Sequence, residues 1–228
     1  MIALIEAMGA RRYAPLGQLC SGSCQRAMVW YAWDAAVAAG FFELLRHFEN
    51  ALGRAMSARL AAGFARADWW NAQTLDLTYT GNAMIEKAAE RIGRTRGTAP
   101  VGSFANELML GFWVSLLSRG SDYDNRLWRP MLRHAFPEYR GSRAALHQDL
   151  AYLVTLRNKI AHHAPIGSRH LPADHESIHR IVGYLGQLQV KWLERHDRVP
   201  ALLALRPGRC PNGHLCVADV EGRLHYDV

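Results

Sequence analysis

A helical pattern closes at the stretch Leu156-Arg157-Asn158-Lys159-Ile160-Ala161-His162-His163-Ala164-Pro165. Ser142 is a suitable cap, and the spacing predicts a helix over residues 143–163. Its apolar stripe comprises Leu146, Leu150, Leu153, Val154 and Ile160. At about 100° per residue, Arg157 falls within this stripe, whereas Asn158 and His162 are neighbours on an adjoining face. Because an unpaired buried charge is too costly, Arg157 must be paired or line a cleft.

The N-terminal half carries a longer helical pattern. Apolar residues recur three or four apart from Trp30 to about Phe64, which predicts one long amphipathic helix or two helices joined at Gly53. Residues 1–28 contain turn-forming residues after a short helical start, so a small helix and a loop are expected there.

Between these two patterns, a short charged helix is predicted over residues 82–92. Arg91, Arg94 and Arg96 then stand in a stretch rich in glycine, with Pro100 at its end. This basic loop is either a solvated linker or an RNA-binding segment, since arginines contact phosphates well.

Further helical patterns follow. Ser103 can cap a helix through Leu117, and residues 123–134 predict another. Asp174 can cap a helix that reaches about His196, and residues 197–205 predict a last short one. The tail, residues 206–228, shows alternating apolar residues typical of a β-hairpin or an extended arm. These patterns predict an all-α fold with a short irregular or β-hairpin tail.

Composition bounds the class of protein. Half of the residues are hydrophobic and 21% are charged, which is typical of a chain with a substantial core. The net charge of +7 favours a polyanionic partner, above all nucleic acid. The first residues lack the pattern of a signal peptide, and the apolar window Leu108–Leu117 is shorter than the roughly 20 residues of a membrane span. We therefore expect a soluble, cytoplasmic protein without a membrane partner.

The four cysteines are too few for a disulfide scaffold of this length. In the tail, Cys210-x-x-x-His214-x-Cys216 could bind zinc if Cys20 or Cys24 supplied a fourth ligand. The other interpretation is reduced thiols, because the spacing matches no common zinc module. We expect no metal ion and no cofactor.

With its Arg157-Asn158-(three residues)-His162 motif and the doubled His163, the chain resembles the Abi-like (abortive infection) proteins of the HEPN ribonuclease superfamily. Two further stretches carry the resemblance. They are the aromatic entry from Tyr31 through Phe48-Glu49-Asn50-Ala51-Leu52, and Leu108–Leu117 followed by Leu127-Trp128. Together these stretches span about residues 28–196.

The resemblance implies a HEPN-like helical bundle with extra helices. Its expected organisation is an N-terminal helix and loop over residues 1–28, an Abi-like helical domain over 29–205 and a tail over 206–228. It also implies a metal-independent endoribonuclease whose site is assembled across a homodimer. Such a protein would act as a toxin-like effector in abortive infection or phage defence, with an antitoxin or a regulatory partner.

The residue types suit cleavage through the 2′-hydroxyl of RNA. A histidine such as His162 can exchange protons near neutral pH, and Arg157 can clamp phosphate oxygens. Asn158 can orient either group. His163 is a supporting candidate, as a second proton donor or as a helix-end histidine. Glu49 is expected to hold Arg157 by an ion pair, or else to be a surface carboxylate.

Two other interpretations remain open. The first is a catalytically silent module that binds RNA or a protein, and the second is a dimeric scaffold with the motif helix as its interface. Trp69-Trp70, Trp113 and Trp128 could stack on bases, although the helical spacing of the last two favours the core.

Overall fold

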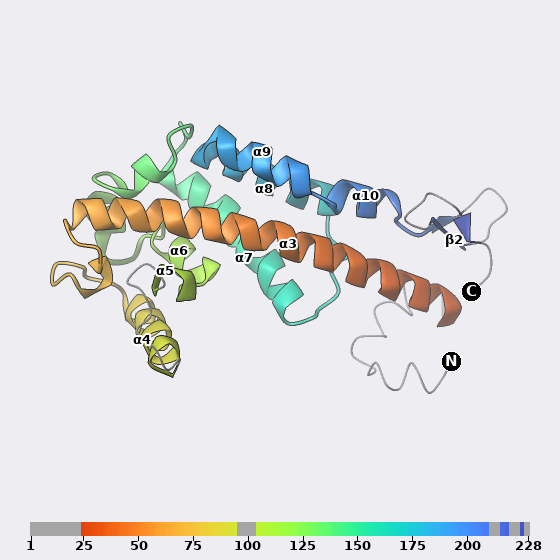
Figure 1. The fold of residues 1–228 in the computed structure, drawn as a ribbon, viewed down its shortest axis with the longest axis horizontal. Coiled ribbons are helices and arrows are strands. Elements are labelled where there is room, and N and C mark those ends of the chain that lie inside the picture. The colour runs from red at the N-terminus through yellow and green to blue at the C-terminus, as the bar shows by residue number, and fades with distance from the viewer. Residues whose placement is uncertain (1–23, 95–103, 210–214, 219–223, 226–228) are drawn as a thin grey trace. The chain divides into compact units, whose positions relative to one another are not determined.

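A computed structural model describes residues 24–94, 104–209, 215–218 and 224–225 (Figure 1). The all-α fold is confirmed. Contacts group the chain into two compact units, which are described separately below. Unit 1 comprises Met1–Glu43, Leu156–His175 and His196–Val228, and unit 2 comprises Leu44–Thr155 and Glu176–Arg195.

The α-helices are α3 (Cys24–Gly63), α4 (Tyr79–Arg94), α5 (Phe104–Glu107), α6 (Leu110–Ser115), α7 (Arg143–Ala161), α8 (Leu171–Leu185), α9 (Gln187–His196) and α10 (Val199–Ala204). Shorter helical turns lie at Trp69–Asn71, Gly120–Asp122, Asp124–Trp128 and Leu132–Ala135. The tail forms three short antiparallel strands, β1 (Gly208–Arg209), β2 (Leu215–Ala218) and β3 (Leu224–His225), in the order β1-β2-β3.

The long N-terminal pattern is one continuous helix, α3, so the alternative break at Gly53 is wrong. Gly53 is buried, and a Cβ there would lie only 2.8 Å from Nε1 of Trp113. The glycine therefore lets the indole ring approach the helix backbone, and it does not end the helix.

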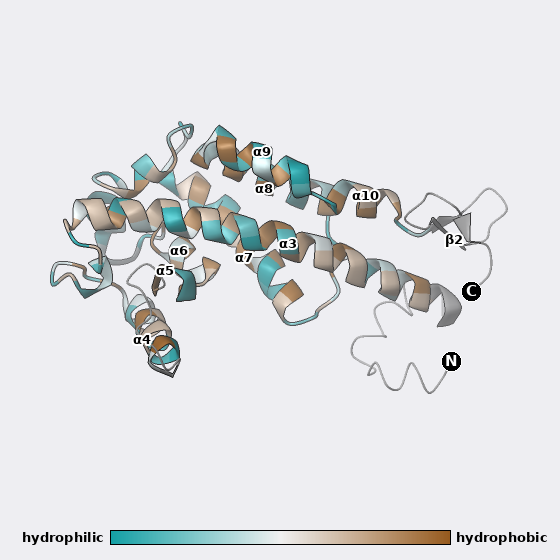
Figure 2. Ribbon diagram, in the orientation of Figure 1, coloured by the Kyte–Doolittle hydropathy of each residue, from teal (hydrophilic) through white to brown (hydrophobic). Residues whose placement is uncertain are grey.

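Among the described residues, Ala27–Gly63 is the one segment long and apolar enough to cross a membrane by length and composition. It is longer than Leu108–Leu117, on which the expectation of no membrane span was based. Figure 2 shows polar and apolar residues interleaved around α3. Part of the apolar surface is covered by protein, because Trp33, Val37 and Phe41 are buried. The cytoplasmic location stays a prediction.

In unit 1, α10 packs against the N-terminal part of α3 (Figure 1). The indole N–H of Trp33 donates to the carbonyl oxygen of Leu202 at 2.9 Å. A Cβ on Gly40 would lie 2.7 Å from Leu202, so this glycine also permits a close approach.

In unit 2, the tryptophans are core residues. Trp69, Trp113 and Trp128 are all buried, and Trp69 lies 5.9 Å from Trp113 between ring centroids. Trp70 is half-buried and stacks on Phe104 at 4.0 Å. Burial excludes the first three as base-stacking residues in this fold.

Three predicted helices are wrong in extent. The one starting at Ser103 is divided into α5 and α6, because the carboxylate of Glu49 accepts the backbone N–H of Leu110 and starts a new helix there. In place of the helix predicted over 123–134, Asp124–Trp128 form a π-helical turn and Leu132–Ala135 form a 3-10 turn. The helix predicted over 174–196 is α8 and α9, separated by Gly186 at φ 140°.

The start of α8 also differs from expectation. The helix begins at Leu171, and Nδ1 of His170 accepts the backbone N–H of Ala173 at 3.2 Å. Asp174 lies in the first turn and is not the cap. The predicted cap of α7 is confirmed, since Ser142 Oγ accepts the N–H of Ala145 at 3.2 Å.

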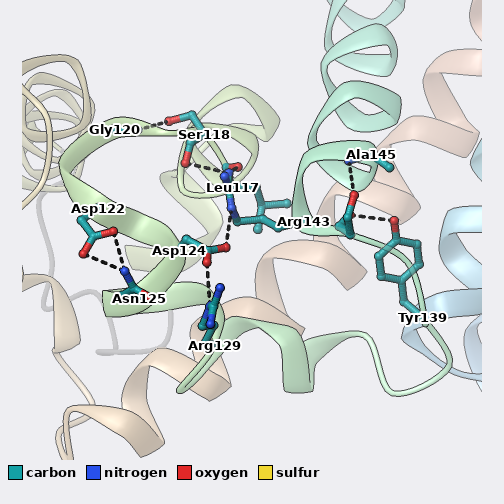
Figure 3. A network of polar contacts seen from close by, with 11 residues as sticks. Leu117, Ser118, Gly120, Asp122, Asp124, Asn125, Arg129, Tyr139, Arg143 and Ala145 are labelled. Carbon is teal, nitrogen blue, oxygen red and sulfur yellow. Dashed lines mark hydrogen bonds and ion pairs between the residues drawn. The ribbon is translucent and has the colours of Figure 1, made fainter.

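The beginning of α7 is anchored by Arg143 (Figure 3). Its guanidinium donates to Asp124 at 3.0 Å, to the carbonyl oxygen of Ser118 at 2.8 Å and to that of Leu117. Asp124 also accepts from Arg129 at 2.7 Å. Hydrogen bonds from Arg129 and then Arg143 lower the pKa of Asp124. The network therefore fixes α7 to the turns before it without leaving an unpaired charge.

Candidate functional site

The Arg-Asn-x3-His motif lies at the C-terminal end of α7, within unit 1. The backbone N–H of His162 donates to the carbonyl oxygen of Asn158 at 3.0 Å, so these residues are one helical turn apart. Both side chains are exposed. The structure thus brings Asn158 and His162 to one face, as the spacing predicted.

Arg157 points to a neighbouring face of the same helix end. Ile160 and Ala161 follow it by three and four residues, the spacing that places helical side chains side by side. Arg157 is half-buried, whereas Leu153 and Ile160 on the apolar stripe are buried. It therefore lies at the edge of the core-facing stripe, a position from which a long side chain can reach solvent.

His163 ends the helix in an unusual backbone conformation. Its φ is 54°, in the left-handed region that favours glycine. Its N–H donates to the carbonyl of Ile160 at 3.0 Å, and the N–H of Ala164 donates to that of Lys159 at 2.8 Å. These two bonds form a Schellman motif with a histidine where glycine is usual. His162 and His163 are both exposed, and their rings form no hydrogen bond with the residues that the structure describes.

We expect His163→Gly to raise the free energy of unfolding by about 0.5–1 kcal/mol, because it removes the left-handed strain of a residue with a Cβ. Urea unfolding followed by circular dichroism measures this. His162→Gly is the matched control: its φ is not positive, so glycine there should lower stability. A His163→Gly protein less stable than the wild type would contradict the account.

A groove of about 650 Å³ lies in unit 1 between the N-terminal part of α3 and the end of α7. Its buried lining residues, Asp34 and Ile160, form the floor. Phe42, Glu43 and His163 are exposed and form the rim. Most of the remaining lining is small and apolar. Because Ile160 and Ala161 both line the groove, the face that carries Arg157 borders it.

Asp34 is fixed by the backbone of the segment after α7. Its Oδ1 accepts the N–H of Ile166 at 2.9 Å and that of Gly167 at 2.5 Å. Burial raises the pKa of Asp34, although the hydrogen bonds from Gly167 and Ile166 oppose that rise. A Cβ on Gly167 would lie 3.0 Å from Asp34 Oδ1 and from the Trp33 ring, so glycine suits this close approach.

One ion pair and one histidine–aspartate contact hold the chain that follows. Arg169 donates to both carboxylate oxygens of Asp174 at 2.8 and 2.9 Å, and the Asp174 side chain is fully buried. Nε2 of His175 lies 2.5 Å from Oδ2 of Asp197. Histidine and aspartate are ligands that zinc accepts, so this pair could supply two of them. The absence of a metal stays a prediction, and Cys20, Cys210 and His214 lie outside the described residues.

The remaining predicted residues are Glu49 and three arginines, and the structure describes only some of their contacts. Glu49 caps α6 through Leu110, so it is not a plain surface carboxylate, and its ion pair with Arg157 stays a prediction. Arg91 lies on α4, not in a loop, and donates to the carbonyl oxygen of Glu107 at 2.9 Å. Arg94 is the last residue of α4, and Arg96 lies outside the described residues.

The residue that the sequence analysis missed is Asp34. Its partners lie 132 and 133 positions away, so no local spacing could reveal them. The available signal was one acidic residue in the otherwise uncharged stretch 27–42 of α3. A charged residue in such a setting needs a partner or a function.

A comparison of the chain with protein-family models, with curated proteins and with solved structures found no match.

Proposed function

We propose that this chain is a metal-independent endoribonuclease that cleaves RNA through the 2′-hydroxyl. The observation that supports it best is the open end of α7, where exposed Asn158 and His162 share a face and Arg157 lies on the next. The proposal also relies on the resemblance to Abi-like HEPN proteins. A positive net charge of +7 is consistent with a polyanionic substrate.

The residues can be given roles that balance the reaction. His162 takes the proton from the 2′-hydroxyl, whose oxygen attacks the adjacent phosphorus. Arg157 stabilises the charge that builds on the phosphate oxygens, and Asn158 orients the imidazole or the phosphate. The 5′-oxygen leaves with a proton, for which the neighbouring His163 is the candidate donor. The products are a 2′,3′-cyclic phosphate and a 5′-hydroxyl.

The biological setting belongs to the same proposal. A toxin-like effector in abortive infection would act as a cytoplasmic homodimer and be controlled by an antitoxin or another regulatory partner. The second candidate is a non-catalytic RNA- or protein-binding HEPN module. It is favoured by the groove, because its mainly apolar lining and the exposed Phe42 at its rim form a larger apolar surface of the kind found at binding sites.

The test is cleavage of labelled single-stranded RNA and transfer RNA by the purified chain with a chelator present. We expect shortened products whose 3′ ends carry a cyclic phosphate, recognised by their resistance to phosphatase until acid opens the ring. A strand with 2′-O-methyl groups throughout should stay intact, since its attacking oxygen is blocked. Absence of cleavage in RNA that the chain binds would favour the binding module.

A further inference from the structure

The groove beside the motif has the features of a ligand site. Its volume of about 650 Å³ falls within the usual range for small-molecule pockets, roughly 300–1,000 Å³. The walls are mainly alanines from α3, together with Ala161 at the end of α7 and Ala164 and Pro165 in the segment after it. Such pockets combine apolar walls with a few placed polar groups, and here Asp34 is the polar group on the floor.

Asp34 presents an acceptor to this groove. Both backbone donors, Ile166 and Gly167, bond to Oδ1. Among the residues that the structure describes, none donates a hydrogen bond to Oδ2. Asp34 as a whole is only 9% exposed, so a ligand that enters the groove would replace the carboxylate's remaining contact with water. A donor N–H on that ligand would compensate for the loss.

The rim adds aromatic surface. Phe42 is 55% exposed and Tyr31 is half-buried, and both line the groove on the α3 side. Flat aromatic side chains stack on flat rings such as nucleobases, whatever the base. On the opposite side, the groove is bordered by the face that carries Arg157 and by His163.

We infer that the groove binds a nucleobase with an exocyclic amino group, as in adenine, next to the phosphate held at the end of α7. The base lies against Phe42, and its amino group donates to Oδ2 of Asp34. This inference rests on the proposed function, since the motif supplies the neighbouring phosphate contact. It assigns the groove a role in choosing which base flanks the cleaved bond.

The test compares two uncleavable 2′-O-methyl strands that differ by one group. One contains adenine and the other contains unsubstituted purine, which lacks only the amino group. At pH 8, chosen because burial raises the pKa of Asp34, fluorescence anisotropy should show about tenfold tighter binding of the adenine strand, the effect of one charge-assisted hydrogen bond.

Asp34→Asn should abolish or reverse this preference. The amide oxygen still accepts the N–H groups of Ile166 and Gly167, but the NH₂ group now faces the ligand and donates. An unchanged melting temperature establishes that the variant is folded. If Asp34→Asn retains the tenfold preference for adenine, the inference is wrong.

A second variant tests stacking. Phe42→Ala should weaken the binding of both strands by a similar factor, at least about fivefold, because stacking does not distinguish adenine from purine. Tyr79→Ala is the control, since Tyr79 is 90% exposed and lies on α4 of unit 2. Equal losses in the two variants would overturn the assignment of Phe42.

Failure of the groove and failure of the ribonuclease can be told apart. Uncleavable strands report only on the groove, and ordinary RNA reports on cleavage. If the chain cleaves RNA but shows no base preference that depends on Asp34, the base-binding role of the groove is wrong and the ribonuclease proposal stands. A preference without cleavage supports the groove as a binding site and overturns the nuclease.

Discussion

Replacing His162 with alanine is expected to slow RNA cleavage by about 10²–10⁴-fold, the usual contribution of a general base or acid. The ring is exposed at the end of α7 and forms no hydrogen bond with the residues that the structure describes. Its removal should therefore not destabilise the fold. His134→Ala is the matched control, because His134 is also exposed but belongs to unit 2. The measurement is the single-turnover rate on labelled RNA in the presence of a chelator.

Arg157 should behave differently from His162. Arg157→Ala removes the phosphate clamp and should lower both the rate and RNA affinity, whereas Arg157→Lys keeps the charge and should recover part of the affinity. Arg195→Ala controls for the loss of one exposed positive charge. Rates equal to the wild type in both His162→Ala and Arg157→Ala would remove the motif from the reaction, whatever RNA the chain binds.

The helical spacing of the sequence predicted the elements that depend on local order. The period of apolar residues located α3 and α7, and Ser142 marked the start of α7. The division of the helix after Ser103 could not be predicted in this way, because Glu49 is 61 positions from the N–H that it accepts. Gly53 was ambiguous for a related reason: its partner, Trp113, lies in a distant segment.

In the candidate site, too, the features that depend on local helical spacing were predicted, and the others were not. Asn158 and His162 were placed together because one helical turn separates them, and that depends only on local geometry. The left-handed conformation of His163 and the groove floor at Asp34 depend on how the chain turns after α7. The tail was predicted as a β-hairpin or an extended arm, and Leu215, Val217 and Leu224 of its alternating residues lie in short antiparallel strands. What the sequence analysis missed therefore depends on contacts between distant segments and on the turn that follows α7.

The largest loss of stability is expected for Asp174→Ala, about 3–5 kcal/mol, because it removes a buried carboxylate that accepts two hydrogen bonds from the Arg169 guanidinium. The Asp174 side chain is fully buried and that of Arg169 is 10% exposed, so water cannot replace the lost bonds. Urea unfolding followed by circular dichroism gives the free energy of unfolding. A variant that unfolds in buffer would be studied with a stabilising osmolyte.

The chain offers a matched control for this pair. Arg66 and Asp68 have the same two-bond geometry, at 2.8 and 2.7 Å, but their side chains are 37% and 39% exposed. Asp68→Ala should therefore cost far less, since solvent screens the exposed pair. Equal losses in the two variants would show that burial is not what makes the Asp174 pair important.

The double variant Arg169→Met, Asp174→Leu distinguishes the contribution of the ion pair from that of filling these two positions with side chains. Because both charges are removed together, it should recover most of the stability lost in Asp174→Ala. The segment after α7 links this result to the groove: the N–H of Arg169 donates to the carbonyl oxygen of Ile166 at 2.9 Å, and the N–H of Ile166 holds Asp34. Asp174→Ala should thus also weaken the adenine preference, and the double variant should restore it. Recovery of stability without recovery of the preference would show that the ion pair itself positions Asp34.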